Sequence, residues 1–470
     1  MPPRFHSLPA EIQCMILEEV SREPSTAGYA VVCKGWQDFF ESKNFKSLAF
    51  QQEDLPVFKD ALVPPRRQGY VKHIWYRIRL PNSNPKKSDT IKTAEKLNVT
   101  FRADKVFTGA VLGLWDKISL WNPQNRITLE LSVYAYDDWH KGMRLQRIFE
   151  RDLDAYKVHK KSESREPYHY DDPHMPYIVK YSVLRVPTAD RRTRNEWNAH
   201  RRNLIGWKDV RLTTAMRGMD SSNKEYNNEE LWPLPRVPIV SKFLIRNTQF
   251  RRIYPETLRQ MFESFPNLED IKMDRWALVG ADEETEWTKQ AGEAFAEKLP
   301  ASVKTLSMSR QKSTVFHDWT SRDIDKREVL GKRFRQYTKN LEHCSLMQII
   351  DAKDFLNLFT PSDKGEDLQL FLRWKYLETL TLSTDSFRSR NQKNIENLLC
   401  DAARAARRMR NLQTLEIISS TDPHCMFQYK IVEAKGVIKW SGPVVNSTRI
   451  MKEWEKTSDW RNNVDVEHDF

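Results

Sequence analysis

Histidine and aspartate side chains lie close together in one polar stretch of the sequence. The stretch contains His159, His169, Asp171, Asp172 and His174. Imidazole nitrogens and carboxylate oxygens are donors that bind divalent metal ions. The spacing is not the one expected of a zinc site, and the polar surroundings predict a loop rather than a rigid element. We therefore expect these side chains to be solvated, and the sequence predicts no metal and no cofactor.

A second acidic pair, Asp323 and Asp325, has the Asp-x-Asp form of some metal-dependent transferases. Because Asp is favoured where a helix begins, we interpret the pair as a helix cap ahead of Val329 and Leu330. The sequence contains no Walker loop, no Gly-x-Ser-x-Gly elbow, no His-Glu-x-x-His and no Cys-x-x-Cys. Without any of these catalytic motifs, the sequence predicts a protein that is not an enzyme.

Cations and aromatic rings alternate in residues 191–207. The segment contains Arg191, Arg192, Arg194, Trp197, Arg201, Arg202 and Trp207. Such alternation is typical of proteins that bind single-stranded nucleic acid, and the net charge of +12 favours the same partner. However, the 76 basic and 64 acidic residues are mixed along the whole chain rather than gathered in one stripe. We therefore expect nucleic acid not to be the principal partner.

The composition predicts an intracellular protein with a substantial core. Of the 470 residues, 39% are hydrophobic, which is enough to build one. No apolar stretch approaches the roughly 20 residues that a membrane span needs, and the N-terminus has no apolar secretory segment. The cysteines are scattered singly at positions 14, 33, 344, 400 and 425, which predicts reduced thiols in the core. We expect a cytoplasmic or nuclear location and no membrane partner.

Apolar residues near the N-terminus recur at helical spacing. The first set, four residues apart, is Leu8, Ile12, Ile16 and Val20. After a break at residues 24–26, a second helical face contains Tyr29, Val32, Cys33, Trp36 and Phe40. A unit of about 40 residues cannot build a sufficient core by itself. These helices must therefore bury their apolar faces against the rest of the chain or against a partner.

The same segment resembles an F-box. The match consists of Leu8-Pro9-x-Glu11-Ile12, then Val32-Cys33-Lys34-x-Trp36, and it continues into Phe45-x-x-Leu48-x-Phe50. The resemblance implies a small cluster of helices that docks onto the Skp adaptor of a cullin-RING ubiquitin ligase, and through it onto the cullin and RING subunits. The adaptor-binding residues that it implies are Leu8, Pro9, Glu11, Ile12, Ile16, Leu17, Val20, Val32, Cys33, Lys34 and Trp36.

The pattern Leu-x-x-Leu-x-Leu recurs five times in the C-terminal half. Its first apolar positions are 268, 303, 341, 377 and 412, which gives steps of 35, 38, 36 and 35 residues. Regular steps of this length predict a solenoid of stacked repeats. Apolar residues at helical spacing lie between the copies, so each repeat is expected to contain one strand and one helix.

Each copy resembles the strand segment of a leucine-rich repeat, although the step is longer than that family's usual one. Because strand-helix-strand crossovers are right-handed, we expect an α/β fold: all-α F-box helices, then a right-handed solenoid with parallel strands on one face and helices on the other. A strand at residues 240–245, another near 71–76, a helix at 106–118 and a strand at 127–133 are expected to precede the five copies.

Four segments follow from these patterns. Residues 1–50 are the F-box, and residues 51–235 are an irregular start of the solenoid with a polar insertion at about 140–177. Residues 236–456 are the repeat region, and residues 457–470 are a loose polar tail.

Alternate strand positions point away from the core, because strand side chains alternate between two faces. They form a strip rich in hydroxyls, which suits an extended peptide, although such side chains can equally do no more than solvate a sheet. The candidate target-binding residues are Lys272, Asp274, Thr305, Ser307, His343, Ser345, Thr379, Thr381, Thr414 and Glu416.

The sequence therefore predicts a substrate-recognition subunit of a cullin-RING ubiquitin ligase of the SCF type, whose solenoid binds an unidentified target protein. The alternative is a repeat scaffold or regulatory protein that delivers nothing for ubiquitination. A more distant alternative is an enzyme with its site in residues 140–235.

Overall fold

The computed structural model describes residues 5–22, 26–81, 93–135, 209–213, 234–246, 251–278, 280–296, 299–311, 334–335, 338–356, 373–388, 392–420, 422, 424–433, 435–443, 447–459 and 466–469. The candidate metal ligands at 159–174, the Arg and Trp segment at 191–207, the Asp323 and Asp325 pair and the polar insertion at 140–177 lie outside these residues.

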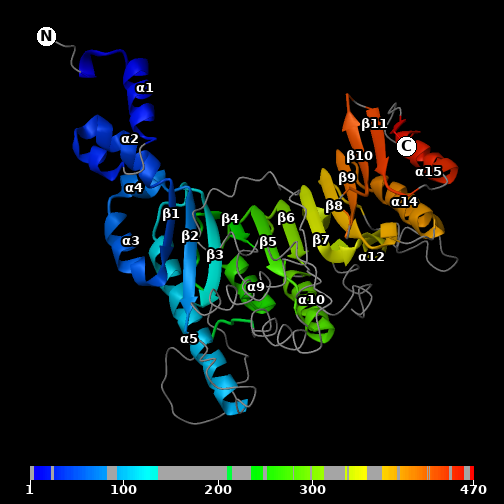
Figure 1. The fold of residues 1–470 in the computed structure, drawn as a ribbon, viewed down its shortest axis with the longest axis horizontal. Coiled ribbons are helices and arrows are strands. Elements are labelled where there is room, and N and C mark those ends of the chain that lie inside the picture. The colour runs from blue at the N-terminus through cyan, green and yellow to red at the C-terminus, as the bar shows by residue number, and fades with distance from the viewer. Residues whose placement is uncertain are drawn as a thin grey trace, which may run out of the picture.

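One twelve-stranded sheet runs through the molecule, with its strands side by side in sequence order (Figure 1). The strands are β1 (Ser47–Gln51), β2 (His73–Leu80), β3 (Ile127–Ala135), β4 (Val240–Ile245), β5 (Asp270–Trp276), β6 (Thr305–Gln311), β7 (His343–Asp351), β8 (Thr379–Thr384), β9 (Thr414–Ser419), β10 (Met426–Val432), β11 (Lys435–Ser441) and β12 (Val466–Asp469). Strands β1 to β9 pair in parallel. The fold is therefore mixed α/β, with an open sheet.

Helices connect the strands and cover one face of the sheet (Figure 1). They are α3 (Leu55–Ala61), α4 (Pro65–Tyr70), α5 (Thr93–Ile118), α9 (Pro255–Glu263), α10 (Ala281–Ala296), α12 (Ala352–Leu356), α14 (Gln392–Ala406) and α15 (Ser447–Asp459). Short 3-10 turns are η3 (Gln52–Asp54), η6 (Thr338–Asn340) and η8 (Ser386–Arg388). Helix and strand side chains share one apolar core from Phe50 to Trp454.

The five expected strands are confirmed, with their apolar positions facing the core. Ile271, Leu306, Cys344, Leu380 and Leu415 occupy the same register on five neighbouring strands, and all are buried. The helices and strands expected at 106–118, 127–133 and 240–245 are also present, as parts of α5, β3 and β4. The period-2 and period-3.6 patterns therefore located most of the parallel region.

The boundary expected at residue 50 is wrong, because the sheet begins earlier. Residues 47–51 form β1, which pairs in parallel with β2 from Ser47 opposite His73 to Gln51 opposite Arg77. The ring of Phe50 stacks on that of Phe58, with centroids 4.2 Å apart. Leu48 and Phe50 thus lie in the first strand of the sheet, whereas Phe45 is the C-cap of α2.

The C-terminal end also differs from the expectation. Strand β10 is antiparallel to both β9 and β11, and Val432 pairs with Lys435, so only two residues separate β10 from β11. The expected loose tail at 457–470 contains the end of α15 and strand β12, which pairs in parallel with β11. Thr457 is buried, and its hydroxyl donates to the carbonyl of Ala403 at 3.4 Å. The described residues of this segment therefore belong to α15 and to the edge strand β12.

The N-terminal helices extend beyond the β1 edge of the sheet, at the opposite end from β10 and β11 (Figure 1). They are η1 (Phe5–Ser7), α1 (Ala10–Val20), η2 (Ala27–Val31) and α2 (Lys34–Asn44). The single helical face expected from Tyr29 to Phe40 is wrong. Cys33 is extended, with φ −163° and ψ 172°, so it separates η2 from α2 as the N-cap of α2.

Three of the five cysteines lie in the core as expected, namely Cys344, Cys400 and Cys425. Burial raises the pKa of each of these thiols. Cys14 is exposed on α1, and Cys33 is half-buried. The expectation of five core thiols is therefore wrong for the two cysteines of the N-terminal helices.

A buried ion cluster joins the C-terminal ends of β5 and β6 to α10. Arg275 donates to both carboxylate oxygens of Glu284, at 2.5 and 3.0 Å, and Arg310 donates to one of them at 3.1 Å. The backbone N–H of Leu278 adds a bond of 2.8 Å. Burial acts to raise the pKa of Glu284, but the two guanidinium groups and the backbone donor lower it overall.

Candidate functional site

The N-terminal helices are held together by an aromatic cluster. The ring of Trp36 lies 5.4 Å from that of Phe5, 6.1 Å from that of Tyr29 and 5.7 Å from that of Phe40, measured between centroids. Phe40 is fully buried. The cluster fixes η1 and η2 against α2, so the helices have a small core of their own.

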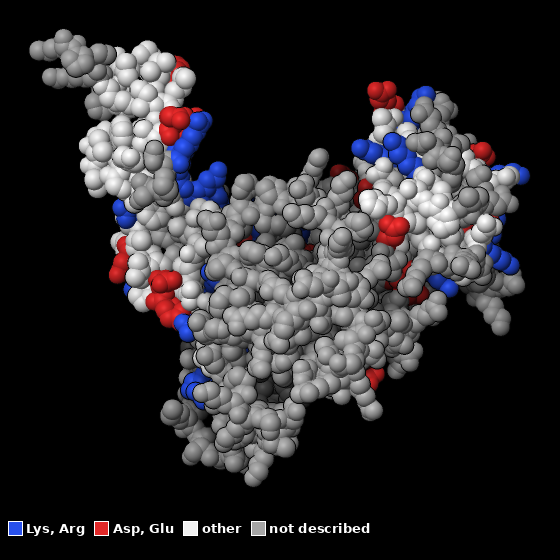
Figure 2. All heavy atoms as spheres, in the orientation of Figure 1, with Lys and Arg blue, Asp and Glu red and all other residues white. Residues whose placement is uncertain are grey.

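The outer surface of these helices is apolar. The exposed fractions are 42% for Ile12, 65% for Met15, 37% for Ile16, 86% for Val31 and 58% for Val32. Of the 11 residues of α1, only Leu17 is buried. Few charges lie on the part of these helices that faces the viewer in Figure 2. Several large apolar side chains on one small unit are typical of a surface that a protein partner covers.

The candidate adaptor-binding residues fall into three groups. Ile12, Ile16 and Val32 are exposed and apolar; Pro9, Glu11 and Lys34 are exposed at the starts of α1 and α2; and Leu8, Leu17, Val20, Cys33 and Trp36 are half-buried or buried. The structure therefore leaves the first two groups accessible, whereas the third group builds the unit itself.

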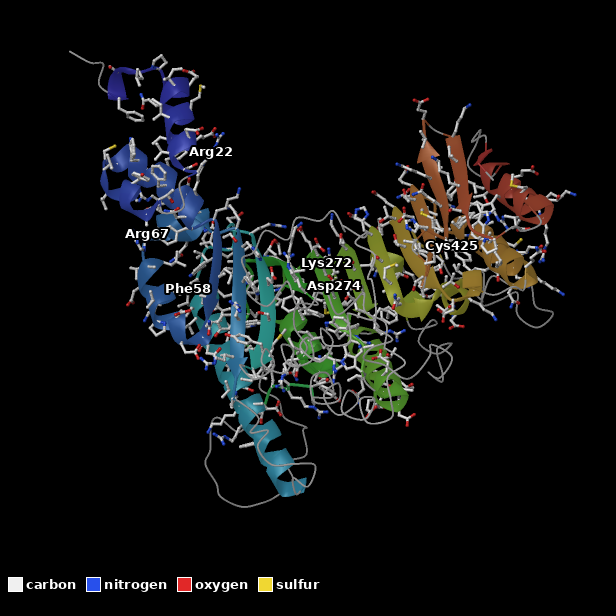
Figure 3. All side chains as sticks on the ribbon, viewed as in Figure 1. Arg22, Phe58, Arg67, Lys272, Asp274 and Cys425 are labelled. Carbon is white, nitrogen blue, oxygen red and sulfur yellow. The ribbon has the colours of Figure 1, made fainter. Side chains whose placement is uncertain are left out.

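Glu41 fixes the N-terminal helices to the start of the sheet region. Its buried carboxylate on α2 binds Arg66 at 2.5 Å and Arg67 at 2.7 Å, both on α4. Figure 3 shows Arg67 at the foot of these helices. Burial acts to raise the pKa of Glu41, but hydrogen bonds from Arg67, Gln37 and Arg66 lower it overall. A charged contact thus attaches α2 to α4, in addition to the packing of Phe45 against the apolar core.

The candidate target-binding residues lie together on the face of the sheet opposite the core. One row across the strands contains Asp270, Thr305, His343, Thr379 and Thr414. The next row contains Lys272, Ser307, Ser345, Thr381 and Glu416. Figure 3 labels Lys272 and Asp274 on β5, midway along the sheet. The ten candidates share one surface, which we call the strand-face strip.

Several polar groups of the strip already bind one another. The Nδ1 atom of His343 lies 3.0 Å from the hydroxyl of Thr379, and the hydroxyl of Ser309 donates to Asp274 at 2.6 Å. Thr381 donates to Glu416 at 3.4 Å. These contacts support the interpretation that part of the strip stabilises the sheet. By contrast, the side chains of Lys272, Ser307 and Ser345 make no hydrogen bond within the described part of the chain, so their polar groups are available to a ligand.

The sequence analysis missed a polar row on the same face, at β1 to β4. The hydroxyl of Ser47 lies 3.2 Å from Nδ1 of His73, whose Nε2 lies 3.0 Å from the carboxylate of Glu130. Arg246 donates to the same carboxylate at 2.9 Å. The contacts from a serine to a histidine and on to a carboxylate have the composition of a hydrolase triad. Here, however, Arg246 already neutralises the carboxylate of Glu130. The row joins four strands, which only the fold brings together.

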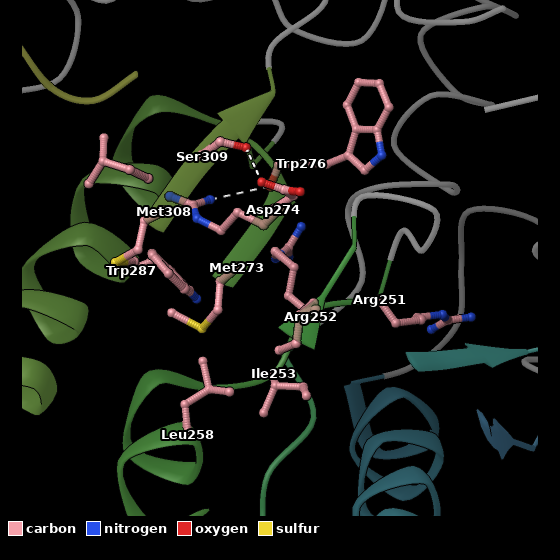
Figure 4. A pocket seen from close by; sticks show the side chains of 13 residues that line it. Arg251, Arg252, Ile253, Leu258, Met273, Asp274, Trp276, Trp287, Met308 and Ser309 are labelled. Atoms are coloured by element: carbon pink, nitrogen blue, oxygen red, sulfur yellow. Dashed lines mark hydrogen bonds between the residues drawn. The ribbon is translucent and has the colours of Figure 1, made fainter. Parts of the chain in front are cut away.

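A small cavity lies beside the strip, between β5, β6 and α9 (Figure 4). Its volume is about 30 Å³, which accommodates about one water molecule. Met273, Met308 and Trp287 line it together with Leu258, and Asp274 and Ser309 meet at its rim. The cavity is therefore a packing defect in the core rather than a site for an organic ligand.

The comparisons with known proteins cover only part of the chain. Residues 298–470 match a family of unknown function (DUF6546), a segment that includes β6 to β12. No curated protein matches the chain. No helix among the described residues is long and apolar enough to cross a membrane. The N-terminal helices lie outside the matched segment, so their role depends on their own geometry.

Proposed function

We propose that this chain is the substrate-recognition subunit of an SCF-type cullin-RING ubiquitin ligase. In this proposal the N-terminal helices bind the Skp adaptor, and the strand-face strip binds the protein to be ubiquitinated. The observation that carries the proposal is the exposed apolar surface of Ile12, Ile16 and Val32. This surface coincides with positions at which the sequence resembles an F-box.

The apolar surface has the composition of a docking interface. Its centre is aliphatic, and charged residues such as Glu11 and Lys34 are exposed near the starts of α1 and α2. Interfaces between proteins usually have an apolar centre and a polar rim. Exposed aliphatic side chains gain free energy when a partner removes them from water, roughly 25 cal/mol for each Å² buried. An adaptor that covers them would supply this stabilisation.

We further propose that β1 to β9 with their helices form a right-handed solenoid similar to leucine-rich repeats. The supporting observations are the parallel pairing in sequence order and the alignment of core residues from strand to strand. Right-handed crossover is the rule for parallel strands joined through a helix. The antiparallel β10 and β11 would then close the repeat array at its C-terminal end.

Within the strand-face strip, the proposed target site centres on Lys272, Ser307 and Ser345. Their polar groups are not used by the sheet, whereas Thr379, Thr381 and Asp274 already have partners. Two hydroxyls and one cation suit an extended peptide that offers backbone carbonyls and an acidic side chain.

The test compares the proteins that co-purify with the intact chain and with the Ile12→Gln, Ile16→Gln double variant. The proposal predicts that the adaptor, cullin and RING subunits are lost from the variant, while a target protein is retained and becomes longer-lived in cells. If adaptor binding is lost but no retained protein changes its lifetime, the chain is a scaffold. If the same ligase subunits co-purify with both, the proposal is wrong.

A further inference from the structure

A basic hollow lies near the N-terminal ends of β8 and β9, and none of its lining residues belongs to the strand-face strip or to the N-terminal helices. Its volume is about 560 Å³, within the usual range for small-ligand pockets. The described residues that line it are Arg373, Trp374, Lys375, Arg407, Arg408 and Arg410. None of these lining residues is acidic, and five of the six carry a positive charge.

The two segments that form the hollow are held rigidly. The backbone N–H of Trp374 donates to the carbonyl of Arg408 at 3.0 Å, and Trp374 also forms an isolated parallel bridge with Met409. The buried indole of Trp374 donates to Thr338 at 2.7 Å. Asn411 donates to the carbonyl of Lys375 at 3.0 Å. The cations therefore project from fixed backbone, so a ligand need not order the loops when it binds.

Of these cations, Arg407 shares a carboxylate with other basic residues, and two others have no ion-pair partner within the described part of the chain. Arg407 binds Glu453 at 2.5 Å, but this carboxylate is shared with Arg404 and Lys456. Burial acts to raise the pKa of Glu453, yet Arg407 and Arg404 lower it overall, which indicates a positive local potential. Within the described part of the chain, Arg373 and Arg408 have no ion-pair partner. A concave site lined by one sign of charge concentrates ions of the opposite sign.

The residue types suit phosphate groups. Four of the five cations are arginines, whose planar guanidinium group makes paired hydrogen bonds to phosphate oxygens. The hollow is compact, whereas a nucleic-acid strand requires a basic track along a groove. We propose that this hollow binds a small ligand that carries several phosphate groups. The inference does not depend on adaptor or target binding.

Calorimetric titration of tripolyphosphate into the intact chain tests the proposal. We expect saturable binding at one site. The Arg373→Gln, Arg408→Gln double variant should lose at least about tenfold in affinity, because charge-assisted hydrogen bonds are removed. Neither side chain holds the fold through an ion pair, so the thermal midpoint without ligand should stay unchanged. Lys375→Gln provides a second, single change with the same expected direction.

The matched control is Arg22→Gln, which removes an exposed arginine from the distant end of α1 (Figure 3) and should not alter the affinity. Three results would overturn the proposal: no saturable binding to the intact chain, equal affinity in the double variant, or equal losses in the control. Tighter binding of a single-stranded oligonucleotide with the same number of phosphates would also overturn it, in favour of a nucleic-acid site.

Discussion

The N-terminal helices and the parallel sheet differ in how far their apolar residues are buried. In the sheet, Leu306, Leu380 and Leu415 are buried, and hydroxyl-bearing residues occupy the outer face. In the N-terminal helices, Ile12 and Val32 are exposed, although aromatic residues fill a small core beneath. Both regions belong to one chain and contain helices of similar apolar character.

The difference is the reason for which we propose a partner for the N-terminal helices rather than for the sheet core. The sheet buries its apolar surface by stacking each strand on the next, so its stability comes from within the chain. The N-terminal helices are too small to bury theirs. Substitutions in the sheet core should therefore change the free energy of unfolding, whereas substitutions on the outer face of α1 should change binding alone.

The largest expected effect on stability belongs to Glu284. Glu284→Gln removes the carboxylate and leaves Arg275 and Arg310 buried without it, so the free energy of unfolding should fall by ~3–5 kcal/mol. Denaturant unfolding measures the change. Glu286→Gln on the exposed face of the same helix is the control, with an expected change within ~0.5 kcal/mol. Equal effects of the two changes would show that the ion cluster does not stabilise the sheet.

The Glu284 contribution should also depend on pH. The pKa of this carboxyl is lower in the folded chain than its ordinary value of 4.5. Its stabilising contribution is therefore fully present above pH 4.5 and is lost as the pH falls below that value toward the folded pKa. The difference in unfolding free energy between the natural chain and Glu284→Gln should shrink as the pH is lowered from about 6 to about 3. A difference that grows on acidification would contradict a lowered pKa of Glu284 in the folded chain.

Leu380→Ala should be the next largest change. Leu380 is fully buried on β8, between two parallel neighbours, and truncation of such a leucine costs ~2–5 kcal/mol through lost burial and a residual cavity. The matched control is Ser345→Ala on the opposite face of the neighbouring strand, with an expected change within ~0.5 kcal/mol. Equal changes in the free energy of unfolding for the two variants would show that Leu380 does not face the core while Ser345 faces outward.

Substitutions on the strand-face strip should leave stability nearly unchanged and remove target capture. Lys272→Glu reverses a charge, and Ser345→Tyr fills the space above the row on β7. The expected stability change is within ~0.5 kcal/mol, because neither side chain makes a hydrogen bond or ion pair with another described residue. Co-purification of target and adaptor measures the outcome, with Lys289→Glu on the exposed side of helix α10 as the control. Retained target capture would place recognition outside the strip.

The sequence predicted the strands of the repeating part of the fold well, because the strand pattern and the helix pattern are both local in the sequence. A strand with Leu306 and Met308 at alternate positions, followed by a helix with an apolar stripe, is readable without knowledge of the neighbours. The ion cluster of Glu284 was not readable in this way. Arg275 and Arg310 come from different strands, and only parallel stacking brings them to one carboxylate.

The misassigned ends have physical causes of their own. The β10 and β11 hairpin was missed because Glu433 and Ala434, rather than Asn and Gly, separate the strands, although Glu433 has a φ of 51°. Strand β12 was missed because its residues are polar, and it forms only because the edge of β11 offers it hydrogen bonds. In the candidate site, the exposed face of α1 could be predicted as apolar, but not as exposed, since helical spacing alone does not say what covers a face.

The most direct test of the central claim is the affinity of purified Skp adaptor for the intact chain and for the Ile12→Gln, Ile16→Gln variant. Both changes keep good helix formers on an exposed face, so the free energy of unfolding should stay within ~0.5 kcal/mol. The control Leu120→Gln replaces an apolar residue outside the N-terminal helices that is more exposed, at 85% against 42% for Ile12 and 37% for Ile16.

The account predicts saturable one-to-one binding of the adaptor to the intact chain and to the Leu120→Gln control. It predicts that the double variant loses ~2 kcal/mol or more of binding free energy, as truncated apolar anchors do. Calorimetric titration measures all three proteins under the same conditions. No adaptor binding to the intact chain, or the same affinity in the double variant, would contradict the claim that these exposed side chains form the docking surface.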